Sequence, residues 1–236
     1  VRLGASPFRR ALRAPTGAPK PSWRERCGGM KPVLQSPRST KGGRAALQIL
    51  RSEREYTGKA SVLALGTFDG VHIGHAALIR RAHDIAADMG ADCVVCTFDR
   101  HPLAVLHPER APAQLTTLAE KCAKFAFLGA DYTLVRHFTL ELASQSAEAY
   151  LTQLVQSMRA VAVVVGENHR FGFHGQGDAR LIGEMSAKMD FAAVIVPPVY
   201  DQGELVSSTL IRRLLASGER ARAERLLDIE SAAHAL

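Results

Sequence analysis

From residue 60 onward the sequence predicts an α/β fold, an open parallel sheet with helices on both of its faces. Two observations lead to this prediction. Short apolar segments alternate along the chain with longer segments in which apolar residues recur every three or four positions. The short segments are apolar throughout, which is typical of strands that are covered on both faces.

The predicted elements follow one another in regular alternation. Strands are expected at residues 61–67, 92–98, 131–135, 160–165 and 191–196. Helices are expected at residues 74–89, 117–128, 146–157, 178–188, 208–216 and 220–227. A Rossmann-like sheet of this kind binds ligands at the carboxyl ends of its strands. The loops expected to carry function are therefore 66–75, 98–102, 136–140, 166–177 and 197–208.

The composition of the chain changes near residue 45. Residues 1–59 hold 14 Lys and Arg against 3 Asp and Glu, whereas residues 60–236 hold 16 against 20. Residues 1–44 are rich in Pro, Gly, Ser and Arg without an apolar period, which predicts a disordered basic tail before a domain at 45–230. The tail could be an arm for acidic partners, an organelle transit peptide, or an over-extended start with Met30 as the true first residue. The initial Val1 favours the last interpretation.

Charge and hydropathy narrow the classes of function. Because the positive charge lies in the tail and not in the predicted domain, nucleic acid is not an expected partner. No apolar run approaches the roughly 18 residues that span a membrane, and no signal-peptide core stands near the start. We therefore expect a soluble, cytoplasmic protein without a membrane partner. Cys93 and Cys96 have CxxC spacing inside a predicted strand, which favours buried apolar residues over a redox or zinc site.

The segment LGTFDGVHIGH, residues 65–75, carries the strongest functional signal. It joins the first predicted strand to the first long helix, and the free N–H groups of a helix N-terminus favour anions. Gly66 and Gly70 let the backbone approach a ligand, and His72 and His75 are spaced so that both can point into one pocket. The pattern predicts a phosphate site. The alternatives are a structural turn with a capped histidine, and a zinc site for which HxxH supplies only two ligands.

Four motifs of the sequence resemble those of one enzyme family, in the same order. GTFDGVHIGH resembles the HxGH motif of the nucleotidylyltransferase superfamily. TFDRHP at 97–102, GENHRFGFHGQGD at 166–178 and VSSTLIRRLLASGE at 206–219 are similar to motifs of the adenylyltransferase module of bacterial FAD synthetases. The resemblance covers roughly residues 46–228. It implies the nucleotidylyltransferase fold and adenylyl transfer from ATP to FMN, giving FAD and pyrophosphate.

The resemblance also implies roles for individual residues. The groups that handle the phosphates of ATP would be His72, His75, Ser208, Thr209 and Arg212. The ATP pocket would be shaped by Gly66, Thr67, Phe68, Asp69, Gly70 and Gly74. The flavin would meet Phe98, Asp99, Asn168 and Phe171. Ser208 is also expected to cap its helix. Mg²⁺ is expected on the ATP phosphates and not in a protein metal site.

The sequence departs from the family's motifs at three positions. Arg100, His169 and Gly175 stand where proline, phenylalanine and a basic residue are common. Two alternatives therefore stay open: a nucleotidylyltransferase for another acceptor, such as a pantetheine or polyol phosphate, and a non-catalytic module that binds flavin or nucleotide. Family members carry a riboflavin kinase module after the closing helix, and about nine residues follow Leu227 here. We expect no riboflavin kinase activity, with FMN supplied by a separate riboflavin kinase.

Overall fold

The computed structural model describes residues 46–230, so the predicted tail at 1–44, with Met30, lies outside the described residues. Six strands of the described part form one parallel sheet in the order β1-β4-β3-β2-β5-β6. Their bounds are β1 Gln48–Leu50, β2 Ser61–Leu65, β3 Asp92–Phe98, β4 Tyr132–Arg136, β5 Ala160–Gly166 and β6 Ala192–Val196.

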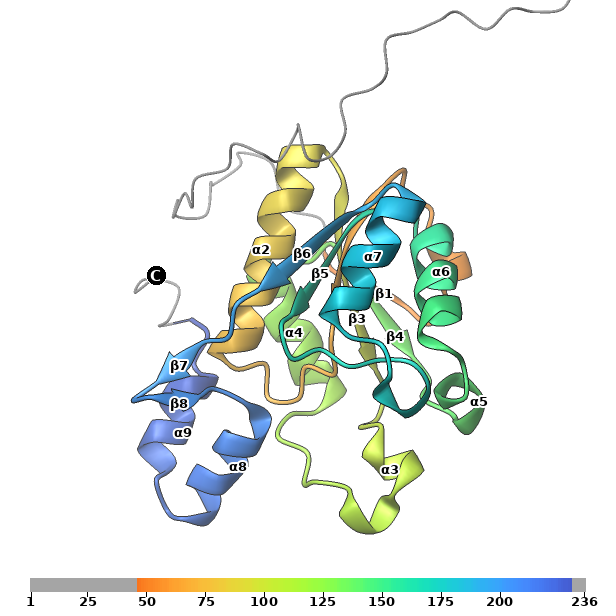
Figure 1. Ribbon diagram of the computed structural model, residues 1–236. Helices are drawn as coiled ribbons and strands as arrows, with labels where there is room; N and C mark the ends of the chain where they lie inside the picture. The colour runs from red at the N-terminus through yellow and green to blue at the C-terminus, as the bar shows by residue number, and fades with distance from the viewer. Residues whose placement is uncertain (1–45, 231–236) are drawn as a thin grey trace, which may run out of the picture. The chain divides into compact units, whose positions relative to one another are not determined.

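Helices cover both faces of this sheet. Helices α2 (Ile73–Met89) and α4 (Leu118–Leu128) pack together on one face (Figure 1). Helices α6 (Ala147–Ser157) and α7 (Ala179–Met189) pack on the other. All five residues of β2, at the centre of the sheet, are buried, as its continuous apolar sequence requires. The predicted fold class, an open parallel sheet with helices on both faces, is confirmed.

Side-chain caps set the exact starts of the main helices. Thr117, Ser146 and Asp178 each precede a helix, and each accepts a hydrogen bond from the backbone N–H three residues on. The prediction that Ser208 caps helix α8 (Ser208–Ala216) is wrong, because Ser207 is the cap and its Oγ accepts from the N–H of Leu210 at 3.2 Å. The Ser208 hydroxyl instead donates to a carbonyl of a distant loop.

The elements that the sequence patterns missed are all short. They are β1, the 3-10 helices η1 (Glu53–Glu55), η2 (Pro108–Arg110) and η3 (Phe173–Gly175), the helices α3 (Leu103–Leu106) and α5 (Leu140–Ala143), and the hairpin β7 (Tyr200–Asp201) with β8 (Glu204–Leu205). None is longer than four residues, so none shows a repeating apolar pattern. Among the described helices, none is both long and apolar enough to cross a membrane.

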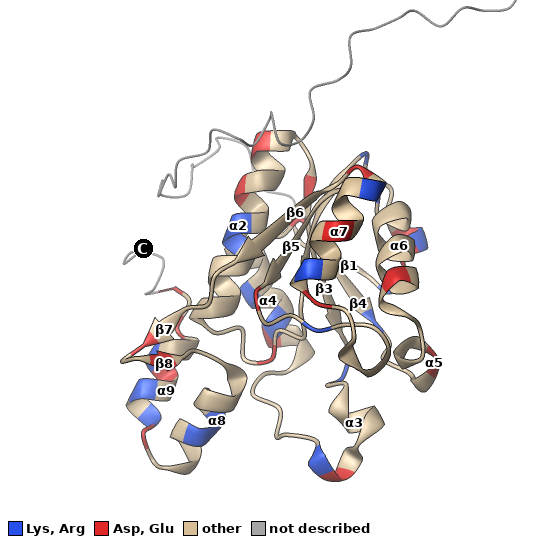
Figure 2. Ribbon diagram, viewed as in Figure 1, with Lys and Arg blue, Asp and Glu red and all other residues tan. Residues whose placement is uncertain are grey.

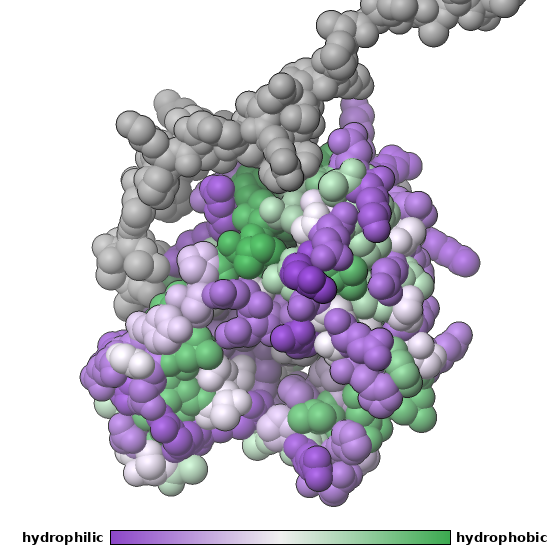
Figure 3. All heavy atoms as spheres, viewed as in Figure 1, coloured by the Kyte–Doolittle hydropathy of each residue, from purple (hydrophilic) through white to green (hydrophobic). Residues whose placement is uncertain are grey.

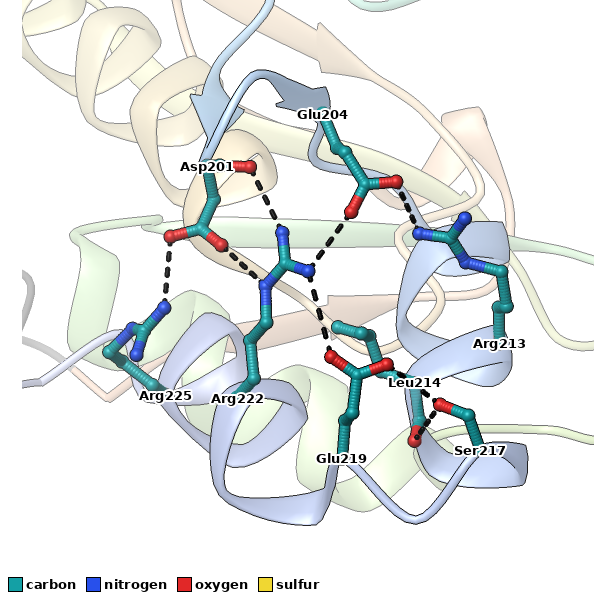
Figure 4. A network of polar contacts seen from close by, with 8 residues as sticks. All are labelled: Asp201, Glu204, Arg213, Leu214, Ser217, Glu219, Arg222 and Arg225. Atoms are coloured by element: carbon teal, nitrogen blue, oxygen red, sulfur yellow. Dashed lines mark hydrogen bonds and ion pairs between the residues drawn. The ribbon is translucent and has the colours of Figure 1, made fainter.

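The hairpin β7–β8 is joined by ion pairs to helices α8 and α9 (Arg220–Leu227). Arg222 donates from Nε to Asp201 at 2.8 Å and from Nη1 to Glu204 at 2.9 Å, and Arg225 also reaches Asp201 (Figure 4). Figure 2 shows the same arrangement as blue bands on α8 and α9 beside red bands on the hairpin. The hydrogen bond from Arg222 lowers the pKa of the Asp201 carboxyl. With the ion pair between Arg213 of α8 and Glu204, these contacts fasten both helices to the hairpin.

Gly172, in the loop after β5, lies close to helix α6, and its replacement tests whether this close packing stabilises the fold. It has φ +73°, and a Cβ atom there would lie 2.5 Å from Cα of Ala147 in α6. We expect Gly172→Ala to lower the free energy of unfolding by about 2–4 kcal/mol, because backbone strain and overpacking add. Urea unfolding followed by circular dichroism would measure it.

Gly203→Ala is the matched control, because Gly203 has φ +80° with nothing within 4 Å of its added Cβ. Its free energy of unfolding should fall by only about 1–2 kcal/mol, because the strain of a positive φ is then the one unfavourable change. Equal losses in the two variants would show that the contact with Ala147 has no effect on stability.

Candidate active site

Two cavities open at the carboxyl ends of the strands and share a wall. The smaller, about 370 Å³, lies between the N-termini of α2 and α8. The larger, about 570 Å³, lies between the end of β3, α3 and the loop 167–175. Figure 3 shows this face hollowed between the part that carries α8 and the part that carries α3. The residues lining both cavities are Leu65, Gly66, Thr67, Asn168 and His169.

The imidazole pair, His72 and His75, stands at the start of α2 in the wall of the smaller cavity. His72 is the N-cap, and its Nδ1 accepts from the N–H of His75 at 3.3 Å. This bond places the proton of a neutral His72 on Nε2. The two rings stack with centroids 3.7 Å apart. A Cβ atom on Gly74 would lie 3.2 Å from His72 Nδ1, which explains the glycine between the histidines.

Both imidazoles are neutral at pH 7. Burial, followed by the charge of Lys124, lowers the pKa of His72 to about 4. Burial, followed by the neighbouring His72 and the lysines of α4, lowers the pKa of His75 well below its usual value. A neutral imidazole still donates one N–H, and a bound phosphate would favour a second proton on it. The pair is therefore suited to binding an anion, and its protonation would change when the anion binds.

The turn that leads to the imidazole pair has a strained backbone. Phe68 and Val71 have φ of +49° and +44°, and Gly70 has φ +85°. Positive φ is a real outlier for a β-branched residue such as Val71. Phe68 is fully buried, and a Cβ on Gly66 would lie 2.9 Å from its ring. Gly66 thus makes room for the phenyl ring under the turn.

Helix α4 holds this turn from behind. The buried Lys121 donates from Nζ to the carbonyl of Thr67 at 2.9 Å. Lys124 donates from Nζ to the carbonyl of Gly70 at 3.1 Å, and the N–H of Gly70 donates to Thr116 Oγ1 at 3.0 Å. These bonds satisfy backbone groups that the strained turn cannot pair within itself.

Helix α8 supplies the opposite wall of the smaller cavity. Ser208, Thr209 and Arg212 line it, together with the imidazole pair. Arg212 forms an ion pair with Asp69 and donates from Nε to the carbonyl of Ala113 at 2.8 Å. The Ser208 hydroxyl donates to the Asp69 carbonyl at 2.8 Å. The structure thus brings together all five residues expected to handle phosphates.

Two residues expected to shape the ATP pocket lie behind its wall. Gly66, Thr67, Phe68 and Gly74 line the smaller cavity, whereas Asp69 and Gly70 line neither cavity. Asp69 is buried, and it accepts from the N–H of Leu115 as well as pairing with Arg212. Its geometry is that of a positioning residue for Arg212.

The residues expected to meet the flavin lie in the larger cavity, with one exception. Phe98, Asn168 and Phe171 line it, and Asn168 also lines the smaller cavity. Asp99 lines neither, because its carboxylate pairs with His137 Nδ1 at 2.6 Å and accepts from the N–H of Phe138. Asp99 therefore holds the chain after β4.

The sequence reasoning missed one imidazole of the smaller cavity. His101 lines it, and its Nδ1 accepts from the N–H of Leu103 at 3.2 Å. Burial, followed by the charge of Arg212, lowers its pKa. The signal was present, because His101 belongs to the TFDRHP segment that follows β3 at the ligand-binding edge of the sheet.

The smaller cavity suits a phosphate chain better than a metal ion held by the protein. Within residues 46–230, no three His, Cys, Asp or Glu side chains are grouped so that they could hold a metal. Among its described lining residues, Glu167 is the one carboxylate.

This fold and this cavity define an α/β protein of the nucleotidylyltransferase type, with an HxGH segment at the first strand–helix turn. The model of the FAD synthetase family matches residues 55–210. The chain belongs to the FAD synthetase family, a family of enzymes.

Three relatives and one solved structure show the extent of the similarity. The bifunctional riboflavin kinase/FMN adenylyltransferase of Listeria monocytogenes is 36% identical over 174 residues, covering 73% of this chain and 55% of the relative. That of Escherichia coli K12 is 34% identical over 167 residues, covering 70% and 53%. A putative one from Geobacillus thermodenitrificans is 34% identical over 174 residues, covering 73% and 92%. The chain thus spans about half the length of the first two.

The solved structure supports the fold. It is a crystal structure of a protein named macrolide-efflux protein, from Streptococcus pneumoniae, with a TM-score of 0.68 and 29% sequence identity. The match covers 77% of this chain and 61% of that chain.

The imidazoles with lowered pKa values predict how the free energy of unfolding depends on pH. Burial lowers the pKa of His169 to about 4, as it does for His72. In the unfolded chain the same groups take up protons near pH 6.5, so the free energy of unfolding should fall as the pH drops from about 6.5 toward 4. Each such histidine adds a slope of up to about 1.4 kcal/mol per pH unit.

Urea unfolding at several pH values between 7.5 and 4.5 would measure the slope. His169→Phe removes one titrating group, so its slope should be shallower by about one histidine's share. A free energy of unfolding that stays constant over this range would contradict the assignment of neutral, buried imidazoles.

Proposed function

We propose that this chain transfers the adenylyl group of ATP to FMN, giving FAD and pyrophosphate. One observation carries the proposal: a cavity lined by N–H donors opens into an aromatic cavity over Gly66 and Thr67. The triphosphate of ATP suits the first cavity, and the flavin ring suits the second. Membership of the FAD synthetase family, and relatives named FMN adenylyltransferase, support the same reaction.

The reaction asks the protein for positioning and charge stabilisation. An oxygen of the FMN phosphate attacks the α-phosphorus of ATP, and the bond from that phosphorus to the bridging oxygen breaks. Pyrophosphate leaves with the electron pair. His72 and His75 donate N–H groups to the α- and β-phosphate oxygens, where negative charge grows. No covalent intermediate with the protein is needed.

Helix α8 receives the leaving pyrophosphate. The backbone N–H groups of Ser208 and Thr209 belong to the first turn of the helix, where no intrahelical acceptor exists. Arg212 is fixed by Asp69 and Ala113 through Nη2 and Nε, so Nη1 is left to bind the β- and γ-phosphates. Mg²⁺, bound through the nucleotide, would supply further positive charge to offset that of the phosphates.

The larger cavity orients the acceptor. Phe98 and Phe171 offer apolar surface to the isoalloxazine ring, and Asn168 lies at the junction where the acceptor's phosphate must enter. FMN itself must come from a reaction that phosphorylates riboflavin, which we assign to a separate riboflavin kinase.

The direct test incubates purified protein with ATP and Mg²⁺, and with either FMN or riboflavin, and separates the products by HPLC. We expect FAD from FMN, and no FMN from riboflavin. Absence of FAD, together with tight binding of ATP or FMN by calorimetry, would contradict the proposed reaction. It would indicate another phosphate acceptor or a non-catalytic binding module.

Replacement of one imidazole tests the catalytic role of the pair. We expect His75→Ala to lower kcat by about 10²–10³, the effect of removing one oxyanion donor, with little change in folding. Steady-state kinetics with thermal unfolding would measure both. His83→Ala, two turns further along α2 and in neither cavity, is the control and should keep its activity. A loss of folding that matches the loss of activity would show a structural histidine instead.

A further inference from the structure

A buried ion pair stands at the end of the larger cavity, outside the residues assigned above to adenylyl transfer. Arg136 is the last residue of β4, and its Nε lies 3.2 Å from Oε1 of Glu53 in η1. Their side chains are only 15% and 13% exposed. Arg136 lines the larger cavity, whereas Glu53 does not. The carboxylate thus supports the guanidinium from behind the wall.

The guanidinium has hydrogen-bonding capacity that the described residues do not use. Its Nη1 is buried and has no hydrogen-bond partner among them. The carbon of the guanidinium lies 5.4 Å from the ring centroid of Tyr150, which also lines the cavity. An unpaired buried donor is destabilising, and more so when it is charged. A ligand that accepts a hydrogen bond would remove this penalty.

The rest of the wall defines what kind of ligand could do so. Its aromatic members are Phe98, Phe138, Tyr150, Phe171 and Phe173. Among the described lining residues there is no Asp or Glu. Arg170, the other arginine of the wall, is 64% exposed and pairs with Asp178. The cavity therefore offers flat apolar surfaces and one buried cation, which suits a planar ring with carbonyl oxygens or basic nitrogens at its edge.

The order of the strands shows which end of the acceptor Arg136 would meet. Gly66, in the shared wall, follows β2, and β3 separates β2 from β4. In the register of β3 and β4, Arg136 lies beside Phe98, the last residue of β3. The acceptor's phosphate must lie at the shared wall to reach ATP. Arg136 thus stands at the opposite end, where the ring lies.

We propose that Arg136, held by Glu53, determines acceptor specificity by donating a hydrogen bond from Nη1 to the polar edge of the flavin ring. The identity of the ring rests on the proposed function. The hydrogen bond itself can be tested by ring binding, without catalysis.

A purely structural role for the ion pair is the competing explanation. In that case the pair only fastens η1 to the end of β4, and its removal changes stability without changing binding. Such a role leaves Nη1 of Arg136 and Oε1 of Glu53 both without a hydrogen bond, and measurement of ring binding distinguishes it from the proposal.

The test compares two ligands in one variant, Arg136→Met, in which an apolar side chain of similar length replaces the guanidinium. Quenching of flavin fluorescence gives Kd for FMN and for lumiflavin, which has the ring but no phosphate. We expect both Kd values to rise about tenfold or more, the loss of one charge-assisted hydrogen bond. KM for ATP should stay within twofold. Arg220→Met, on α9 and 79% exposed, is the control and should change neither Kd.

Two results would overturn the proposal. If Kd rises for FMN and not for lumiflavin, Arg136 binds the phosphate and not the ring. If neither Kd changes while the midpoint of thermal unfolding falls, the ion pair is structural. Should Arg136→Met not fold, Glu53→Gln provides the second variant. It keeps the guanidinium and loosens its orientation, so a smaller rise in both Kd values is expected, and no rise in either would count against the proposal.

The same data separate this inference from the proposed function. Ring binding that depends on Arg136 in a protein that makes no FAD would retain the inference and reject adenylyl transfer to FMN. FAD synthesis, together with ring binding that does not depend on Arg136, would support adenylyl transfer to FMN and reject the role of Arg136.

Discussion

The strained turn between β2 and α2 is the constraint on which the rest of the site depends. Three of the four residues from 68 to 71 have unusual backbone angles, because Phe68, Gly70 and Val71 all have positive φ. This path brings His72 to the N-cap of α2 and turns the side chain of Asp69 toward α8. A relaxed turn would point both side chains elsewhere. The strain therefore belongs to the geometry of the site.

The lysines of α4 are the reason that this turn can persist. Lys121 and Lys124 place ammonium groups on carbonyls of the turn, and the same charges contribute to the low pKa of the imidazole pair. Burial lowers the pKa of both imidazoles most, and the lysines that fix the backbone lower it further. The positive surroundings also favour an incoming triphosphate. One face of α4 thus contributes both hydrogen bonds to the turn and positive charge near the imidazole pair.

The sequence allowed the fold and the smaller cavity to be predicted well, and the larger cavity only in part. Continuous apolar strands and capped helices are local patterns, and the five residues expected to handle phosphates lie in two motifs at the starts of α2 and α8. The inward role of Asp69 depends on partners more than 40 residues away, which no local pattern encodes. Arg136 and Glu53 meet only because β4 and η1 are brought together by the sheet. Four-residue helices were missed because they show no period.

Residues after 210, including helix α9, make contacts with the rest of the domain. The match to the family model stops at residue 210, within α8. Yet Lys124 donates to the carbonyl of Leu227 as well as to that of Gly70, and Arg80 of α2 donates to the carbonyl of Ile229. Arg222 adds the contacts of α9 with the hairpin. A shortened chain that ended with the matched region would keep the HxGH segment, but Lys124 would lose one of its two carbonyl contacts. The packed domain is therefore longer than the region that the family model matches.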